Sequence, residues 1–226
     1  MNMVELFIGP RWFLGIDTLF ELISIIVSFL ISLFAYKIYK LASQKKYLNF
    51  SLAFFLIAIG LFFKIISNFV VFYKTVEKTF YGLFTVTYTY SFNSINLISL
   101  FLFRFLTLTA FLMILANILK IKDKRIITLM LFFTVIATIF SNYAYFVFHL
   151  TLALILGFIS FYYFKNTKIK RSRSAFMVMF SFLALFLSQI LFVFFALDHG
   201  FYAFGEILQL VGFLFLLFAY ISVFKK

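Results

Sequence analysis

The 226-residue sequence contains no cysteine, one proline, two histidines and only seven acidic residues. Without cysteine, disulfides and thiolate chemistry are excluded. The single proline, Pro10, lies before the first long apolar run. The sequence also lacks a Gly-x-Ser-x-Gly motif, a Gly-rich phosphate loop and a His-Glu-x-x-His motif. We therefore do not predict an enzyme.

Polar residues are too few for a water-soluble domain. Apolar residues make up 65% of the chain and aromatic residues 24%, whereas a soluble domain has about 45–50% apolar residues. This composition predicts an integral membrane protein. The net charge of +13 would suggest nucleic acid in a soluble protein, but the topology of a membrane protein explains it better, and we predict no nucleic-acid partner. The first residues lack a basic region, so no cleavable signal peptide is expected.

Seven apolar segments predict an all-α, seven-transmembrane-helix bundle that forms a single domain over residues 1–226. Each segment approaches or exceeds the length that spans a bilayer. The predicted spans cover about 13–36, 47–72, 92–119, 126–141, 143–164, 174–197 and 202–224. The longest connection, an outer loop over 73–91, alternates Thr with Val and Tyr from Thr85 to Tyr90. That alternation fits a strand or hairpin, and an irregular lid is the alternative.

Basic residues predict the orientation. Fifteen of the 20 lysines and arginines fall after spans one, three and five and at the C-terminus. Short basic loops stay on the cytoplasmic side. The N-terminus should therefore lie outside and the C-terminus in the cytoplasm, with the protein in the cytoplasmic membrane. On the cytoplasmic side these loops should contact anionic lipids.

A lone arginine, Arg104, lies near the middle of the apolar run over 92–119. A charge there costs at least roughly 2.5–3.5 kcal/mol on insertion scales, so it should be buried against partners. At about 1.5 Å per residue, the long polar side chains of six spans lie in the outer half of the membrane or near its midplane. Together with Asp17 and Asn68, on the same helical faces, they form the candidate set: Asp17, Glu21, Lys64, Asn68, Arg104, His149, Gln189, Glu206 and Gln209.

Two interpretations of this set stay open. In the first it is a structural network, in which Glu21 or Glu206 pairs with Lys64 and Arg104 and the glutamines fill the remaining hydrogen bonds. In the second it lines an outward-open polar pocket that binds a small ligand or an ion. Six helices converging on one layer is more than a single structural ion pair requires.

No cofactor is predicted. His149, His199 and Glu206 lack the spacing of a zinc site such as His-x-x-x-His, which disfavours zinc. Microbial rhodopsins share the number of spans and the orientation, but they carry a Schiff-base lysine in the seventh helix. The seventh span here has no lysine before Lys225, which excludes retinal attachment there.

A weak internal similarity appears at an offset of 128 residues. It pairs Phe20-Glu21-Leu22 with Phe148-His149-Leu150, Ser32 with Ser160, Lys37 with Lys165, Lys40 with Lys168, and Phe54 with Phe182. It indicates a 3+1+3 parallel repeat with the fourth span as linker. This plan resembles SWEET and PQ-loop transporters. Those families use prolines within their helices, and this chain has none there.

Our leading hypothesis is a sensor or receptor-like module that binds a small ligand in the polar pocket. Its shape resembles, in topology alone, the seven-helix input domains of bacterial and archaeal sensor proteins. Its output would need a separate cytoplasmic or membrane protein partner, because every inner loop is short. The first alternative is a transporter of a small solute, or one coupled to protons, and the second is a structural subunit of a membrane complex.

Overall fold

A computed structural model of the chain describes residues 10–13, 15–80, 90–170 and 172–224. These residues form helices and their connections and include no strand, which confirms the all-helical prediction. The α-helices are α1 (Ile16–Ala42), α2 (Lys45–Phe80), α3 (Tyr90–Ile118), α4 (Lys124–Phe140), α5 (Tyr145–Lys170), α6 (Arg173–Val193) and α7 (Gly200–Phe224), and the short 3-10 helices are η1 (Arg11–Phe13) and η2 (Phe194–Ala196).

Local polar residues fix where several helices begin. The Asp17 carboxylate accepts hydrogen bonds from the backbone N–H groups of Gly15 and Thr18 at 2.9 and 2.8 Å, at the start of α1. Asp123 accepts the N–H of Arg125 at 2.8 Å at the start of α4, and Ser172 accepts that of Ala175 at 3.2 Å at the start of α6. Such caps satisfy N–H groups that have no partner inside the helix.

Six of the helices are long and apolar enough to cross a membrane, within the part of the chain that the structure describes. These spans are Ile16–Ala42, Lys45–Val70, Ser94–Ile118, Tyr145–Lys168, Arg173–Ala196 and Gly200–Ser222. The remaining helix, α4, has 17 residues. At about 1.5 Å per residue it is about 25 Å long, shorter than the roughly 30 Å hydrocarbon core of a bilayer.

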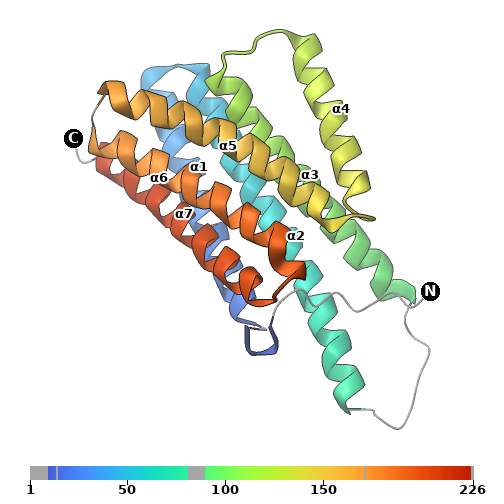
Figure 1. Cartoon of the computed structure of the whole chain (residues 1–226). Helices are drawn as coiled ribbons and strands as arrows, with labels where there is room; N and C mark the ends of the chain where they lie inside the picture. Colours follow the sequence, from blue (N-terminus) through green and yellow to red (C-terminus); the bar gives the residue numbers. More distant parts are fainter. Residues whose placement is uncertain (1–9, 14, 81–89, 171, 225–226) are drawn as a thin grey trace.

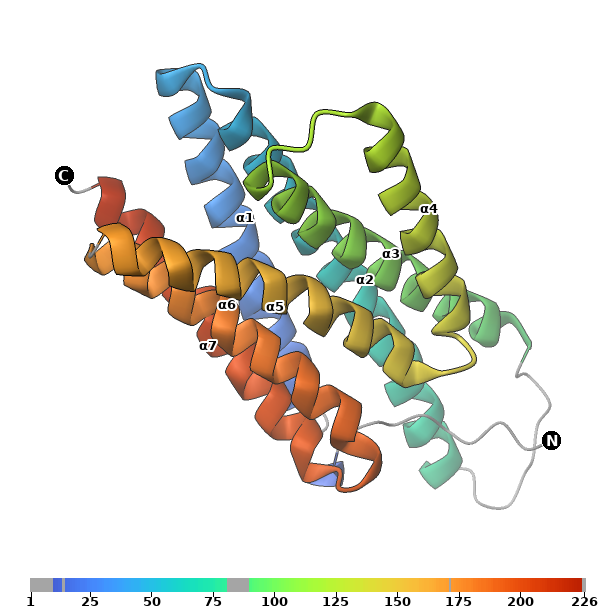
Figure 2. The same ribbon diagram turned by 45° about the horizontal axis from the view of Figure 1, so that its top comes forward.

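The six long helices form a closed ring in which each contacts the next. The order around the ring is α1, α2, α3, α5, α6 and α7, and α7 closes it by contacting α1 (Figures 1 and 2). Contacts are most extensive within α1–α2–α3 and within α5–α6–α7, and less extensive across α1·α7 and α3·α5. The shorter α4 packs on the outside against α3 and α5, with only Thr134 and Thr138 buried on it.

The connections that carry the basic clusters lie at one end of the bundle. They join α1 to α2, α3 to α4 and α5 to α6, at the same end as the C-terminus of α7 (Figure 1). At the opposite end the outer connection is shorter than the predicted 73–91, because α2 continues to Phe80 and α3 begins at Tyr90. Tyr90 is thus helical, and the rest of the predicted strand or lid, 85–89, lies outside the described residues.

A continuous apolar core fills the space between the helices. It includes Ile31 on α1, Phe54 on α2, Leu108 on α3 and Phe182 on α6, all fully buried. A glycine brings α2 closest to α3: a Cβ added to Gly60 would lie 2.9 Å from Thr107 Oγ1 and 3.3 Å from the Phe103 carbonyl. Small residues allow this close approach of membrane helices, and Gly60 lies one turn before the first functional candidate on α2, Lys64.

Candidate functional site

A buried ion cluster joins three helices. Lys64 Nζ on α2 lies 2.8 Å from Glu21 Oε1 on α1 and 2.6 Å from Glu206 Oε1 on α7. Asn68, one turn further along α2, donates from Nδ2 to both carboxylate oxygens of Glu21, at 3.0 and 2.9 Å. The carboxylate side chains are 0 and 1% exposed and that of Lys64 is 13% exposed. Glu21, Lys64, Asn68 and Glu206 are called the ion cluster below.

Three aromatic rings surround the ammonium group of Lys64. Their centroids lie 5.6 Å (Phe103), 5.9 Å (Phe192) and 5.9 Å (Tyr202) from Nζ. A cation within about 6 Å of an aromatic face is attracted by its quadrupole. The rings come from α3, α6 and α7 and form apolar walls beside the ammonium group. Any charge in the cluster that is not neutralised is therefore costly.

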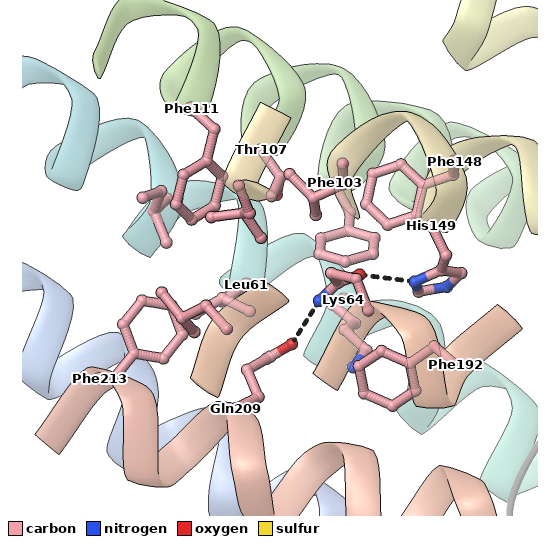
Figure 3. Close-up of a pocket in the computed structure, with 15 residues that line it drawn as sticks. Leu61, Lys64, Phe103, Thr107, Phe111, Phe148, His149, Phe192, Gln209 and Phe213 are labelled. Atoms are coloured by element: carbon pink, nitrogen blue, oxygen red, sulfur yellow. Dashed lines mark hydrogen bonds between the residues drawn. The ribbon is translucent and has the colours of Figure 1, made fainter. Parts of the chain in front are cut away.

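A chain of amide and imidazole side chains lies next to the ion cluster. Gln189 Oε1 on α6 is 2.7 Å from His149 Nδ1 on α5, and because a carbonyl oxygen accepts, Nδ1 donates. The amide of Gln189 donates in turn to Gln209 Oε1 on α7 at 3.3 Å (Figure 3). It also donates to Ser188 Oγ at 3.3 Å. This chain ties α5, α6 and α7 together through neutral hydrogen bonds.

A cavity of about 30 Å³ adjoins Lys64 and is lined by residues of α2, α3, α5, α6 and α7 (Figure 3). Its polar wall consists of Lys64, Thr107, His149, Gln189 and Gln209, and the rest is apolar. Among the described residues, Thr107 Oγ1 has no hydrogen-bond partner. The volume holds about one water molecule, whereas pockets for organic ligands are usually about 300–1,000 Å³. The space therefore suits a water molecule or a small ion.

Arg104 is held apart from the ion cluster. Its Nη1 donates to the Ser141 carbonyl at 3.0 Å, to Ser141 Oγ at 3.1 Å and to Asn142 Oδ1 at 2.9 Å. Ser141 and Asn142 form the turn between α4 and α5. Among the described residues, no carboxylate lies within 4.0 Å of the guanidinium group. Arg104 is 7% exposed, so a nearly buried charge is stabilised here by neutral acceptors.

The structure divides the candidate set into three groups. The ion cluster holds Glu21, Lys64, Asn68 and Glu206; the hydrogen-bonded chain holds His149, Gln189 and Gln209; Asp17 and Arg104 lie apart. Asp17 caps α1. Of the structural network, one of the two interpretations of the sequence, the structure contains the pairing of Lys64 with Glu21 and Glu206 but not the pairing of Arg104 with either carboxylate. The sequence placed the turn between the fourth and fifth spans at about Ser141–Asn142, but it did not predict that this turn contacts Arg104, nor the rings around Lys64. The shortness of the fourth span was the available signal for a turn deep enough to meet Arg104.

The partner of Arg104 gives a direct test of this geometry. Replacing Asn142 by alanine should lower the free energy of unfolding by about 1.5–3 kcal/mol, because a hydrogen bond to a charged group is lost. Asn142→Asp should instead stabilise the protein, because it places a carboxylate at the 2.9 Å position of Oδ1. Reversible unfolding of the purified protein in mixed micelles measures both. Equal destabilisation by alanine and aspartate would contradict the contact.

Comparison with known proteins gives no relative for this chain. No protein-family model, no curated protein and no solved structure matches it. Within the described residues, no three His, Asp or Glu side chains gather as metal ligands. The groups that the site brings together are two buried carboxylates and one ammonium, with an adjoining cavity of the size of a water molecule.

Proposed function

We propose that this chain is a receptor-like module of the cytoplasmic membrane that binds a small ion at the ion cluster and signals through a separate partner. The observation that carries the proposal is the double ion pair of Lys64 with Glu21 and Glu206. Buried ionisable groups in a membrane span are expensive and mark functional sites by default. The cavity of about 30 Å³ beside Lys64 limits the ligand to the size of an ion or a water molecule.

The orientation we propose has the N-terminus outside and the C-terminus in the cytoplasm. The common end of the basic connections supports it, because lysine and arginine in short loops are retained on the cytoplasmic side. In that orientation α4 also crosses the membrane, from the basic segment that precedes it to the Ser141–Asn142 turn, and brings the number of spans to seven. The basic end would contact anionic lipid headgroups and the partner that receives the signal.

A transporter is the second candidate, and the arrangement of the ring favours it. Adding 128 to the bounds of α1 gives 144–170, and α5 is Tyr145–Lys170; adding 128 to Lys45, the first residue of α2, gives Arg173, the first residue of α6. This agreement supports a parallel repeat of α1 and α2 in α5 and α6, whereas the third pair does not keep the offset: 128 added to Tyr90, the first residue of α3, gives 218, and α7 begins at Gly200. Transporters built from repeats bind substrate between the repeats, and the Lys64–Glu206 pair joins α2 of one unit to α7 of the other.

Reconstitution distinguishes the two candidates. The purified full-length chain is placed in liposomes, and proton, sodium and potassium fluxes are measured with internal dyes. Thermal stability in micelles is measured with the same ions. A receptor-like module should be stabilised by one ion and show no flux. Flux that Lys64→Met abolishes would overturn the receptor in favour of a transporter. Neither flux nor stabilisation, with a partner that co-purifies, would identify a structural subunit and overturn both candidates.

A further inference from the structure

We propose that the ion bound at the ion cluster is a proton, shared as one exchangeable proton between Glu21 and Glu206. The inference names the ligand of the site and rests on the proposed function for its biological role. It starts from the imbalance of charge: two carboxylates face one ammonium, at 2.8 and 2.6 Å from Nζ. With every group ionised, the cluster would carry an excess negative charge.

That excess charge is buried where solvent cannot neutralise it. The Glu21 and Glu206 side chains are 0 and 1% exposed, and aromatic rings enclose the ammonium between them. An uncompensated charge in such surroundings is strongly unfavourable. Two carboxylates that meet at one site do not ionise independently, so the proton belongs to the pair rather than to either residue. Binding it converts one carboxylate to a carboxylic acid and leaves one ion pair with Lys64.

Other titratable and charged groups surround the cluster. On α1, Asp17 caps the helix; on α3, Arg104 bonds to the Ser141–Asn142 turn; on α5, His149 donates to Gln189. The Tyr145 ring on α5 contacts that of His149 at a tilt, with ring centroids 4.6 Å apart, and the Tyr202 ring on α7 lies beside the Lys64 ammonium. Among the described residues, none but Lys64 brings a positive charge within 4.0 Å of either carboxylate.

A route for exchange is present beside the cluster. Of the three residues in the ion pairs, Lys64 has the most exposed side chain, at 13%. It also lines the cavity of about 30 Å³. The walls of that cavity offer a water molecule the Lys64 ammonium, the Thr107 hydroxyl, which has no other partner among the described residues, and the Gln209 amide. Such a molecule has the two to four polar partners that a buried water needs. Neither carboxylate lines the cavity, so a proton would pass between such a molecule and the carboxylates through the Lys64 ammonium, which contacts both.

Protonation also changes how the helices are joined. Lys64 links α1 and α7 through two ion pairs, and contacts between α1 and α7 form one of the two less extensive boundaries of the ring. When both carboxyl groups are ionised, two like charges on α1 and α7 share one cation. Proton release would therefore weaken the connection between α1 and α7, and proton binding would strengthen it, in line with the lower stability expected at high pH.

Infrared spectroscopy of the full-length protein in lipid bilayers tests the proposal. The C=O stretch of a protonated carboxylic acid should be present, should shift in heavy water, and should disappear as the pH rises while the protein stays folded. Glu21→Gln and Glu206→Gln should each abolish the titrating band. The matched control is Asp198→Asn at the exposed turn before α7, which keeps the acceptor oxygen for Gly200 N–H and should retain the band. A band that survives both glutamine variants would overturn the proposal.

Two further measurements keep the test decisive if the variants do not fold. In the wild type, one linked proton changes the ratio of folded to unfolded protein by about tenfold per pH unit, and stability should fall as the pH rises because the folded state holds the proton that the unfolded chain releases. If stability does not depend on pH, or if no titrating band is found, the proposal that the bound ion is a proton is overturned. If sodium or potassium at constant ionic strength then stabilises the wild type, the receptor proposal stands with another ligand. If the carboxylic-acid band is present and the protein also carries a proton flux, the proton site stands, and the receptor proposal is overturned in favour of a transporter.

Discussion

Replacing Lys64 by methionine should destabilise the protein by about 3–5 kcal/mol, the cost of removing one partner from a buried ionic group. Methionine keeps an unbranched, apolar side chain of similar length, so packing against Phe103 and Phe192 is largely preserved. The ammonium is lost, and the carboxylates of Glu21 and Glu206 are left facing each other without a cation. The free energy of reversible unfolding in mixed micelles measures the change.

A surface lysine provides the matched control. Lys168 lies near the end of α5, exposed, with its Nζ 4.6 Å from the centroid of the Phe164 ring. Lys168→Met also removes one ammonium but leaves no buried charge, so its effect should stay within about 0.5 kcal/mol. The triple variant Lys64→Met, Glu21→Gln, Glu206→Gln should recover much of the loss, because neutral groups replace the whole cluster. Equal losses at Lys64 and Lys168 would show that the ion cluster contributes no ionic stabilisation.

The helices were predictable because long apolar runs in this chain have few competing signals. The predicted and observed spans differ mainly at their ends, since hydropathy marks the membrane boundary and not the end of the helix. Thus α1 continues through Lys37 and Lys40 to Ala42, and α2 continues to Phe80. The fourth segment shows the same limit: its 17 residues form a helix, yet length and composition alone do not place it across a membrane.

Depth and helical face located the polar layer, but they do not give the neighbours of each helix. Spacing of four placed Lys64 and Asn68 on one face, and the structure directs both toward Glu21. Arg104 lies at a comparable depth, and from depth alone it was an equal partner for the same carboxylates. The position of α4 outside α3 decides otherwise, because it brings the Ser141–Asn142 turn against Arg104. The size of the cavity depends on how bulky rings pack, which no periodicity records.

The ring of Phe192, which lies 5.9 Å from the Lys64 ammonium, packs against a glycine on α7. Phe192 is 2% exposed, and its centroid lies 5.0 Å from that of His149 and 5.6 Å from that of Tyr202. A Cβ added to Gly205 would lie 2.6 Å from Phe192 Cε1 and 2.9 Å from Cδ1. If valine replaces Gly205, its side chain and the Phe192 ring therefore compete for the same space.

A double-mutant cycle should detect that competition. Phe192→Ala alone should cost about 3–5 kcal/mol, because it opens a cavity, and Gly205→Val alone should cost about 1–3 kcal/mol, because it overpacks the contact. Together they should cost less than their sum by about 0.5–3 kcal/mol, since the valine fills part of the space that the ring leaves. Unfolding free energies of the four proteins in mixed micelles give the coupling.

Gly212 supplies the control for this cycle, one packing site further along α7. Its added Cβ would meet Leu185 Cγ at 2.8 Å and the Ser181 carbonyl at 3.0 Å, away from Phe192. Gly212→Ala combined with Phe192→Ala should be additive to within about 0.5 kcal/mol. Additivity at Gly205 as well would mean that α6 and α7 do not meet at Phe192. Coupling at Gly205 alone would show that α6 and α7 pack against each other through the Phe192 ring, the ring that also lies beside the Lys64 ammonium.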